Sequence, residues 1–265
     1  MSDAGVIHVT LNALYYAYRW MNPPEVTICG FTGSGKSTLD YFMSTPCDEV
    51  PVLPETHHEP VVSRTDLMRY LFWGYRKHYK EGRYVLPTPT RKRLIVGKER
   101  VILRSSDLGG HEKYWHMAIE DAVMRDSEAI IMLIDDRDLD HDNPNAFIES
   151  QMFFNSMVSA LISGTYSGKD RKVRKKLRHY AEKKLKIFAI IANKADIILG
   201  DDFENRYKPI TARGDPLTRH KIFSKYRPGL TKLETQKGIR TFRLFISART
   251  GWGVNESIKY IRDNL

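Results

Sequence analysis

The chain has 265 residues, 42% of them hydrophobic, which is enough for one sizeable α/β domain with inserts. Its two cysteines, Cys29 and Cys47, are too few for the disulfide framework of a small secreted domain, so we expect a reducing, cytoplasmic compartment. The formal net charge of +10 is concentrated in residues 169–186, and no apolar run approaches the ~18 residues of a membrane span.

The first expected element is an amphipathic helix over residues 5–21, within an N-terminal segment of residues 1–24. Pro23 and Pro24 end its pattern. The segment either enters a membrane surface or is a permanent core or dimer element, and the residues leave both readings open. The apolar side chains at helical spacing are Ile7, Leu11, Leu14, Tyr18 and Met21.

The main domain is expected at 25–265 and begins with a short apolar strand, EVTICG (25–30), that leads into GFTGSGKST (30–38). This loop fits the phosphate-loop pattern G-x-x-x-x-G-K-[ST], in the strand–loop–helix context that the pattern requires. In such a loop the backbone N–H groups wrap phosphates, Lys36 reaches the β and γ groups, and Ser37 ligates Mg²⁺. The expected nucleotide-contacting residues are Gly30, Thr32, Gly33, Ser34, Gly35, Lys36, Ser37 and Thr38.

Beyond the loop, apolar strands alternate with helical patterns. The pattern predicts a doubly wound, mainly parallel α/β sheet covered on both faces. LIV (94–96) and VIL (101–103) predict a hairpin that adds an antiparallel edge. Further strands are expected at 129–135, 187–193 and 242–247, and helices at 112–126, 145–163 and 254–264. Inserts are expected near 44–80, 164–186 and 200–240.

The sequence NKAD (193–196) follows the strand at 187–193 and has the residues to recognise a guanine base. Asp196 can accept two hydrogen bonds from N1–H and the exocyclic amine, a pair that adenine lacks. Lys194 can lay its stem over the ring, and Asn193 can tie this loop to the phosphate loop.

A second base-contacting loop is expected at SAR, after the last strand, where the backbone N–H of Ala248 would lie near the guanine O6. Ser247, Ala248 and Arg249 therefore join the expected site. NKAD alone could be a solvated turn at a strand end. Together with the phosphate loop and SAR it predicts that the chain binds GTP and GDP.

DLGGHE (107–112) supplies the next box, in which Asp107 would hold Mg²⁺ through water and the Gly110 N–H would meet the γ-phosphate. With this box the chain resembles small GTPases of the Arf and Sar group, within the Ras-like P-loop GTPases, and Asp-x-Gly-Gly followed by His is typical of the Sar branch. The resemblance covers 25–43, 85–136, 187–196 and 242–265.

The resemblance also implies roles for two more residues. LPTPT (86–90) resembles the switch I box of that group, which makes Thr88 rather than Thr90 the switch I ligand of Mg²⁺. His111 stands where the family has its water-orienting residue, so the implied catalytic residues are His111, Thr88 and Lys36. The long interval between Ser37 and Thr88 departs from the group and implies a large insert in switch I.

The resemblance implies a switch that hydrolyses GTP slowly, with Mg²⁺ as cofactor and with effector, exchange and activating proteins as partners. Two alternatives remain: a GTP-binding scaffold that does not hydrolyse, and a P-loop ATPase or kinase. The basic tract at 169–186 is read as a solvated charged helix, as an anionic membrane contact at the periphery of a bilayer, or, less favoured because Tyr180 is its one aromatic, as a nucleic-acid contact.

Overall fold

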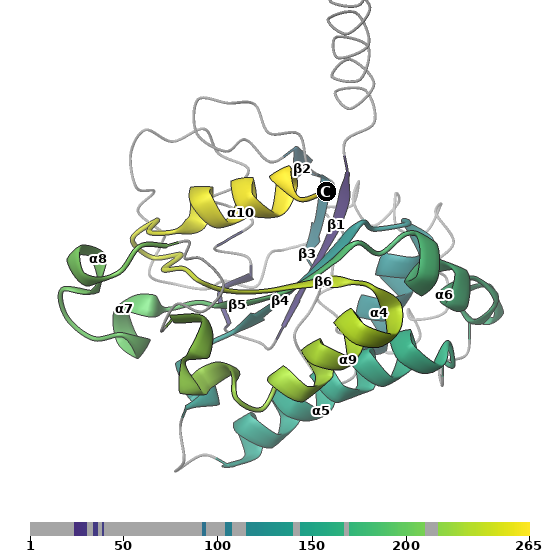
Figure 1. The fold of residues 1–265 in the computed structure, drawn as a ribbon, viewed down its shortest axis with the longest axis horizontal. Coiled ribbons are helices and arrows are strands. Elements are labelled where there is room, and N and C mark those ends of the chain that lie inside the picture. The colour runs from purple at the N-terminus through teal and green to yellow at the C-terminus, as the bar shows by residue number, and fades with distance from the viewer. Residues whose placement is uncertain are drawn as a thin grey trace, which may run out of the picture.

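The computed structural model describes residues 24–30, 34–36, 39, 92–93, 104–107, 115–139, 144–166, 170–209 and 217–265. Within these ranges one sheet has the strand order β2-β3-β1-β4-β5-β6 (Figure 1). All neighbouring strands are parallel except β2, which pairs antiparallel with β3. The strands are β1 (Glu25–Gly30), β2 (Lys92–Arg93), β3 (Arg104–Asp107), β4 (Ala129–Ile134), β5 (Ile187–Ala192) and β6 (Arg240–Phe245).

Two adjacent interior strands, β4 and β5, are apolar along their whole length and completely buried. Such runs are typical of parallel strands that are covered on both faces. Alternate residues divide between two core clusters: Ile130 and Met132 belong to one, and Ile131 and Leu133 belong to the other. The sheet therefore separates two hydrophobic layers.

Helices fill both layers, as Figure 1 shows, with α10 on one side of the sheet and α4, α5 and α9 on the other. The long helices are α4 (Trp115–Met124), α5 (Pro144–Ser163), α6 (Arg171–Lys183), α9 (Arg227–Lys237) and α10 (Val254–Asp263). The shorter elements are η3 (Asp136–Asp138), α7 (Ala195–Ile198), α8 (Phe203–Arg206), η4 (Leu217–Arg219) and η5 (Lys221–Phe223). The predicted fold class, a doubly wound and mainly parallel α/β sheet, is confirmed.

Close packing joins α5 to α9 under the sheet. The ring of Phe154 meets the ring of Tyr226 edge-on at 5.0 Å and that of Phe188 at 5.8 Å. A Cβ at Gly229 would lie 2.5 Å from Phe154 Cε1, so only glycine lets the two helices approach this closely.

Several strand boundaries differ from the sequence prediction. Strands β4, β5 and β6 end one or two residues earlier than expected, at Ile134, Ala192 and Phe245. The antiparallel pair consists of Lys92–Arg93 and Arg104–Asp107, while the predicted apolar strands at 94–96 and 101–103 lie outside the described residues. Strand β6 begins at Arg240 rather than 242, because Arg240 pairs in register with Ile187 although its side chain is exposed at the sheet edge. Backbone pairing, which apolar patterning does not report, sets that boundary.

Several other predicted features lie outside the described residues, namely the N-terminal helix over 5–21 and the insert near 44–80. In the part of the chain that the structure does describe, no helix combines the length and the apolar character needed to cross a bilayer.

Candidate functional site

The carboxyl ends of the parallel strands meet at one edge of the sheet. In register, Gly30 of β1 lies beside Leu133 of β4, and Ala192 of β5 lies between Ile134 of β4 and Phe245 of β6. Chain order reverses at β1 and β4, because β1 has β3 on one side and β4 on the other. Open α/β sheets bind ligands at such a switch point, outside the carboxyl ends of their strands.

The predicted phosphate loop follows β1 at this point, and two glycines give its described residues backbone conformations that other residues rarely adopt. Gly30 has φ +144°, and a Cβ there would lie 2.4 Å from the backbone oxygen of Leu133. Gly35 has φ +85°, and its missing Cβ would lie 2.0 Å from Asn193 Nδ2. Ser34 is fully buried and Lys36 is 6% exposed. Both glycines are required by close contacts as well as by their left-handed backbone.

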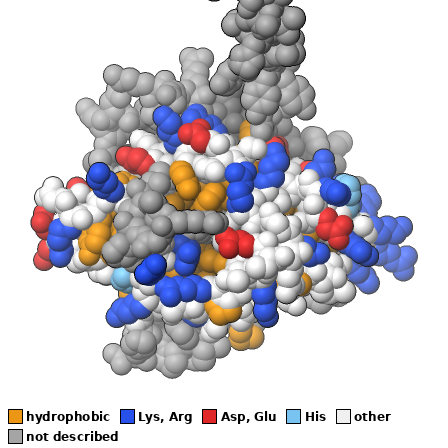
Figure 2. Space-filling view, in the orientation of Figure 1, with side chains coloured by type: hydrophobic (Ala, Val, Ile, Leu, Met, Phe, Trp, Pro, Cys, Tyr) orange, Lys and Arg blue, Asp and Glu red, His pale blue; other side chains and the backbone are white. Residues whose placement is uncertain are grey.

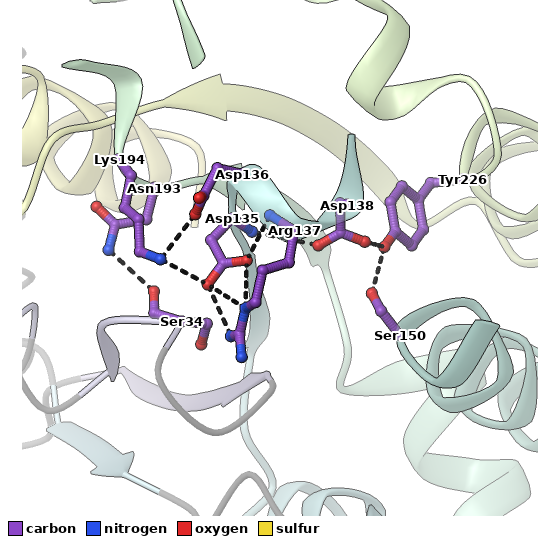
Figure 3. Close-up of polar contacts among 9 residues, drawn as sticks. All are labelled: Ser34, Asp135, Asp136, Arg137, Asp138, Ser150, Asn193, Lys194 and Tyr226. Atoms are coloured by element: carbon purple, nitrogen blue, oxygen red, sulfur yellow. Dashed lines mark hydrogen bonds and ion pairs between the residues drawn. The ribbon is translucent and has the colours of Figure 1, made fainter. Parts of the chain in front are cut away.

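Asn193, directly after β5, connects three segments that are distant in sequence. Its Nδ2 donates to the backbone oxygen of Ser34 at 2.9 Å (Figure 3). Its Oδ1 accepts from the backbone N–H of Ala248 at 2.9 Å. Asn193 is 3% exposed, so both hydrogen bonds are shielded from water. The side chain therefore holds the phosphate loop, the NKAD loop and the SAR loop in one arrangement.

Asp196 and Ser247 bring the two expected base-contacting loops together. Ser247 Oγ donates to Asp196 Oδ1 at 2.7 Å, and the backbone N–H of Ala195 donates to the Ile246 oxygen at 3.0 Å. Ser247 is fully buried, whereas Asp196 is half-buried at the first turn of α7. This hydrogen bond fixes one carboxylate oxygen of Asp196 and so orients the carboxylate as a whole.

Lys194 has a left-handed backbone, with φ 62° and ψ 43°, and its side chain lies against an acidic turn. Its Nζ is 2.7 Å from Asp136 Oδ1 and 3.2 Å from Asp135 Oδ2. Burial acts to lower the pKa of Lys194, but the hydrogen bond to Asp136 and the two carboxylate charges outweigh it and raise the pKa. The ammonium group is therefore charged, and it is tethered at its tip.

The acidic turn that holds Lys194 is η3, which directly follows β4. Asp135 is 1% exposed and caps η3, and the side chain of Asp138 accepts a hydrogen bond from the Asp135 N–H at 3.2 Å. Arg137 donates two hydrogen bonds to the Asp135 carboxylate, from Nε to Oδ1 at 3.0 Å and from Nη2 to Oδ2 at 2.7 Å. That hydrogen bonding raises the pKa of Arg137. Asp135 is thus a buried anion shared between Arg137 and Lys194 (Figure 3).

The same turn continues into a buried network beneath the sheet edge. Tyr226 OH donates to Asp138 Oδ1 at 2.6 Å, Lys225 Nζ lies 2.7 Å from the same oxygen, and Ser150 Oγ contacts the Tyr226 hydroxyl. Burial lowers the pKa of Lys225 and raises that of Tyr226 well above its usual value. Through these contacts the stretch before α9 and helix α5 support the turn that holds Lys194.

Sequence reasoning missed the η3 turn and its partners. The side-chain partners of Asp138, Lys225 and Tyr226, come from the 200–240 stretch, whose pattern predicts no regular element, and Ser150 of α5 supports Tyr226 in turn. The run DDRD directly after a buried strand could have indicated this turn, because buried carboxylates at a strand end need charged partners.

Of the expected metal ligands, Asp107 is the last residue of β3 and pairs in register with Ile28, two residues before Gly30. This register puts its backbone beside the start of the phosphate loop. Lys36 is the one expected catalytic residue that the structure describes. The other expected ligands and catalytic residues lie outside the described residues, as do several loop positions: Thr32, Gly33, Ser37, Thr38, Thr88, Gly110 and His111. Arg249, in the exposed turn after β6, makes no described contact with the other site residues. Among the residues that are described, no cluster of three His, Cys, Asp or Glu side chains could hold a metal ion.

No protein-family model and no curated protein matches the sequence. Among solved structures, the chain is similar to the Arl6 BBS3 small GTPase from Trypanosoma brucei with the bound nucleotide analogue GppNp, at 16% identity and a TM-score of 0.46, over 91% of this chain and 95% of that one. The mammalian SRP receptor gives 13% identity and a TM-score of 0.44, over 91% and 100% of the two chains.

A third similar structure is a GTP-binding protein from the archaeon Sulfolobus solfataricus in complex with GDP, at 14% identity and a TM-score of 0.39. The match covers 97% of this chain but 56% of that one. All three TM-scores are below 0.5, so the function is inferred from the site residues themselves.

Proposed function

We propose that the chain is a P-loop GTPase that binds GTP and GDP with Mg²⁺ at the carboxyl edge of its sheet. The observation that carries this proposal is the bridge made by Asn193 between Ser34 and Ala248. One buried amide holds the loop after β1, which would bind the phosphates, at a fixed distance from the loop after β6, which would contact the base. A ligand that spans the two loops needs phosphates at one end and a base at the other.

The base would be read by Asp196. Its carboxylate is held by Ser247 and half-exposed, so it can receive the N1–H and amino donors of guanine. Lys194 is anchored at its tip by Asp135 and Asp136, which leaves its aliphatic stem to cover the face of the ring. Adenine would leave the Asp196 carboxylate without its donors, which costs orders of magnitude in affinity.

At the other end, Lys36 and the backbone N–H groups of the glycine-rich loop would neutralise the β and γ phosphates. The glycines at 30 and 35 fit this role, since each allows a close backbone approach that a side chain would block. Bound Mg²⁺ would supply charge neutralisation between those phosphates, and Ser37, Thr88 and Asp107 are its proposed ligands. The register of Asp107 beside β1 supports its place in this set.

We further propose that the site hydrolyses GTP slowly and that two switch regions report the presence of the γ-phosphate, as in the Arf and Sar group. His111 would orient the attacking water, Gly110 would contact the γ-phosphate, and effector and regulatory proteins would bind the two switches. The alternative is a GTP-binding scaffold that does not hydrolyse. Single-turnover hydrolysis separates the two, since a scaffold returns the loaded GTP unchanged.

The experiment that tests base recognition is Asp196→Asn. The amide replaces one acceptor with a donor that matches the 2-oxo group of xanthine, so preference should move from guanine toward xanthine nucleotides by at least about 10²-fold. Ser247→Ala is the matched control, because it removes the orienting hydrogen bond without changing the acceptor atoms and should weaken both nucleotides alike. An Asp196→Asn variant with unchanged preference would remove Asp196 from the base site.

A further inference from the structure

We propose that the exposed face of α6 is an electrostatic docking surface for an anionic phospholipid membrane. This basic face carries eight Lys or Arg side chains and one acid, Glu182. Figure 2 shows the Lys and Arg atoms gathered at the right-hand edge of the molecule, where Figure 1 places α6. The basic residues are Arg171, Lys172, Arg174, Lys175, Lys176, Arg178, Lys183 and Lys184.

The helix that presents this face is firmly attached to the domain. Val173 and Leu177 are fully buried in the core, and Tyr180 is 1% exposed, with its hydroxyl donating to the Ser127 backbone oxygen at 2.9 Å. Asp170 caps the first turn by accepting from the Lys172 N–H at 2.7 Å. The charges are therefore displayed on a rigid rod about 20 Å long rather than on a loose tail.

The charge pattern opposes the stability of the helix itself. Like charges stand four residues apart at 171 and 175, at 172 and 176, and at 174 and 178, and each such pair is destabilising. Basic side chains also crowd the first turn, where the helix dipole favours acids. Arg178 with Glu182, at 3.2 Å, is the opposite-charge pair within the helix. A local conflict of this kind is expected where a surface serves a partner of opposite charge.

The chemistry of the face favours lipid headgroups over nucleic acid. Tyr180, its one aromatic, is buried and cannot stack on a base. Between 171 and 184 the exposed side chains are all Lys, Arg, His or Glu, so this stretch offers no amide or hydroxyl for reading base edges. It also exposes no apolar side chain for insertion among acyl chains. What remains is a set of long, flexible cations suited to a fluid anionic surface.

The basic face lies at the end of the molecule opposite the nucleotide site. Only residues 184–186 separate the end of α6 from the first residue of β5, and the Lys186 N–H donates to the Glu128 oxygen just before β4 begins. Asn193 and Ser247, in contrast, follow the carboxyl ends of their strands. The length of a six-residue strand, about 20 Å, separates the two regions. A membrane can therefore hold α6 while the nucleotide site faces away from it, and the proposal does not depend on which nucleotide binds.

The test is sedimentation of the full-length protein with vesicles of phosphatidylcholine alone and with vesicles containing 30% phosphatidylserine. Wild type should bind only the anionic vesicles and should be released by 0.5 M salt, since the Debye length then falls well below 10 Å. Each basic side chain near such a surface contributes about fivefold to partitioning, which corresponds to ~1 kcal/mol. A variant with four of these lysines replaced by glutamine should therefore bind to the anionic vesicles on the order of 10³-fold less tightly, and we call it the quadruple variant. It carries Lys172→Gln, Lys175→Gln, Lys176→Gln and Lys183→Gln.

Two further variants make the result specific. A control with the same loss of charge at exposed sites elsewhere should bind nearly as well as wild type: Lys208→Gln, Lys221→Gln, Lys232→Gln and Lys259→Gln. Glu182→Gln, which removes the one acid of the face, should strengthen binding about fivefold. Equal loss in the quadruple variant and the control, or no binding by wild type, overturns the proposal. So does binding to a 20-base-pair DNA duplex without binding to vesicles.

Nucleotide affinity, measured in parallel, should be the same in wild type and in both quadruple variants. This readout separates a failure of the membrane proposal from a failure of the proposed nucleotide site.

Discussion

Asn193 fills the space that a side chain at Gly35 would need. A Cβ at Gly35 would lie 2.0 Å from Asn193 Nδ2, closer than any packed side chain tolerates. Gly35→Ala must therefore displace Asn193 and break its bonds to Ser34 and Ala248, in addition to the strain of alanine at φ +85°. We expect Gly35→Ala to lower the free energy of unfolding by about 3 kcal/mol or more and to abolish nucleotide binding. Urea unfolding and nucleotide titration measure the two effects.

Gly200→Ala is the matched control for this prediction. Gly200 has φ +77°, but a Cβ there meets nothing within 4 Å. Its substitution should cost only the backbone strain, about 1–2 kcal/mol, and should leave nucleotide affinity intact. If the two alanine variants lose the same stability and the same affinity, the contact between Gly35 and Asn193 has no special role.

Asn193→Asp should separate the two hydrogen bonds of the bridge. The carboxylate can still accept from the Ala248 N–H, but it cannot donate to the Ser34 oxygen and instead places two acceptors together in a buried position. We expect a loss of about 1–3 kcal/mol in stability and at least a tenfold loss in nucleotide affinity. An aspartate variant with wild-type affinity would show that the phosphate loop is positioned without Asn193.

Tyr180 gives a prediction on the alkaline side of the pH scale. Burial raises the pKa of Tyr180 well above the usual value of about 10, so the folded state keeps this proton while the unfolded state loses it. The contribution of the protonated Tyr180 to the free energy of unfolding is therefore fully present below pH 10. Above pH 10 it falls by about 1.4 kcal/mol per pH unit. Tyr180→Phe should cost about 1 kcal/mol at pH 7 through the lost bond to Ser127, and the deficit should vanish near pH 11. Urea unfolding at both pH values checks this, and a deficit that is constant from pH 7 to pH 11 would contradict it.

His111→Ala tests the catalytic part of the proposed function. Removing a residue that orients the attacking water should slow single-turnover GTP hydrolysis by about 10²-fold while leaving GTP affinity nearly unchanged. His179→Ala, at an exposed position on α6, is the matched control and should hydrolyse at the wild-type rate. Identical rates in all three proteins would make His111 a bystander and favour the non-hydrolysing scaffold.

Much of the fold could be predicted because the interior strands β4 and β5 are apolar throughout. AIIMLI and IFAIIA are long enough and buried enough that their pattern alone indicates parallel strands covered on both faces. The edges were harder, since β3 has the sequence RSSD and β6 starts at an exposed arginine. Their strand character comes from pairing with a neighbour, which a single sequence does not display.

The candidate site shows the same contrast between features that a local sequence pattern indicates and features that depend on distant segments of the chain. The sequence predicted the link from Asn193 to the phosphate loop, and the structure contains that contact at 2.9 Å. It did not predict that Asp135 and Asp136 hold Lys194, or that Tyr226 supports the turn through Asp138. Those partners are separated by 58 and 88 residues. Short motifs report only what is local in sequence, and this support comes from chain segments that carry no motif.

The most direct test of guanine-nucleotide binding is titration calorimetry of the wild-type protein, freed of bound nucleotide, with GDP, GTP, ADP and ATP in the presence of Mg²⁺. A site built on Asp196 should bind both guanine nucleotides and should discriminate against ATP by about 10⁴-fold, since adenine leaves the carboxylate unsatisfied. Comparable heats and affinities for ATP and GTP, or no binding of either, would contradict the assignment of Asn193, Lys194 and Asp196 to a guanine site.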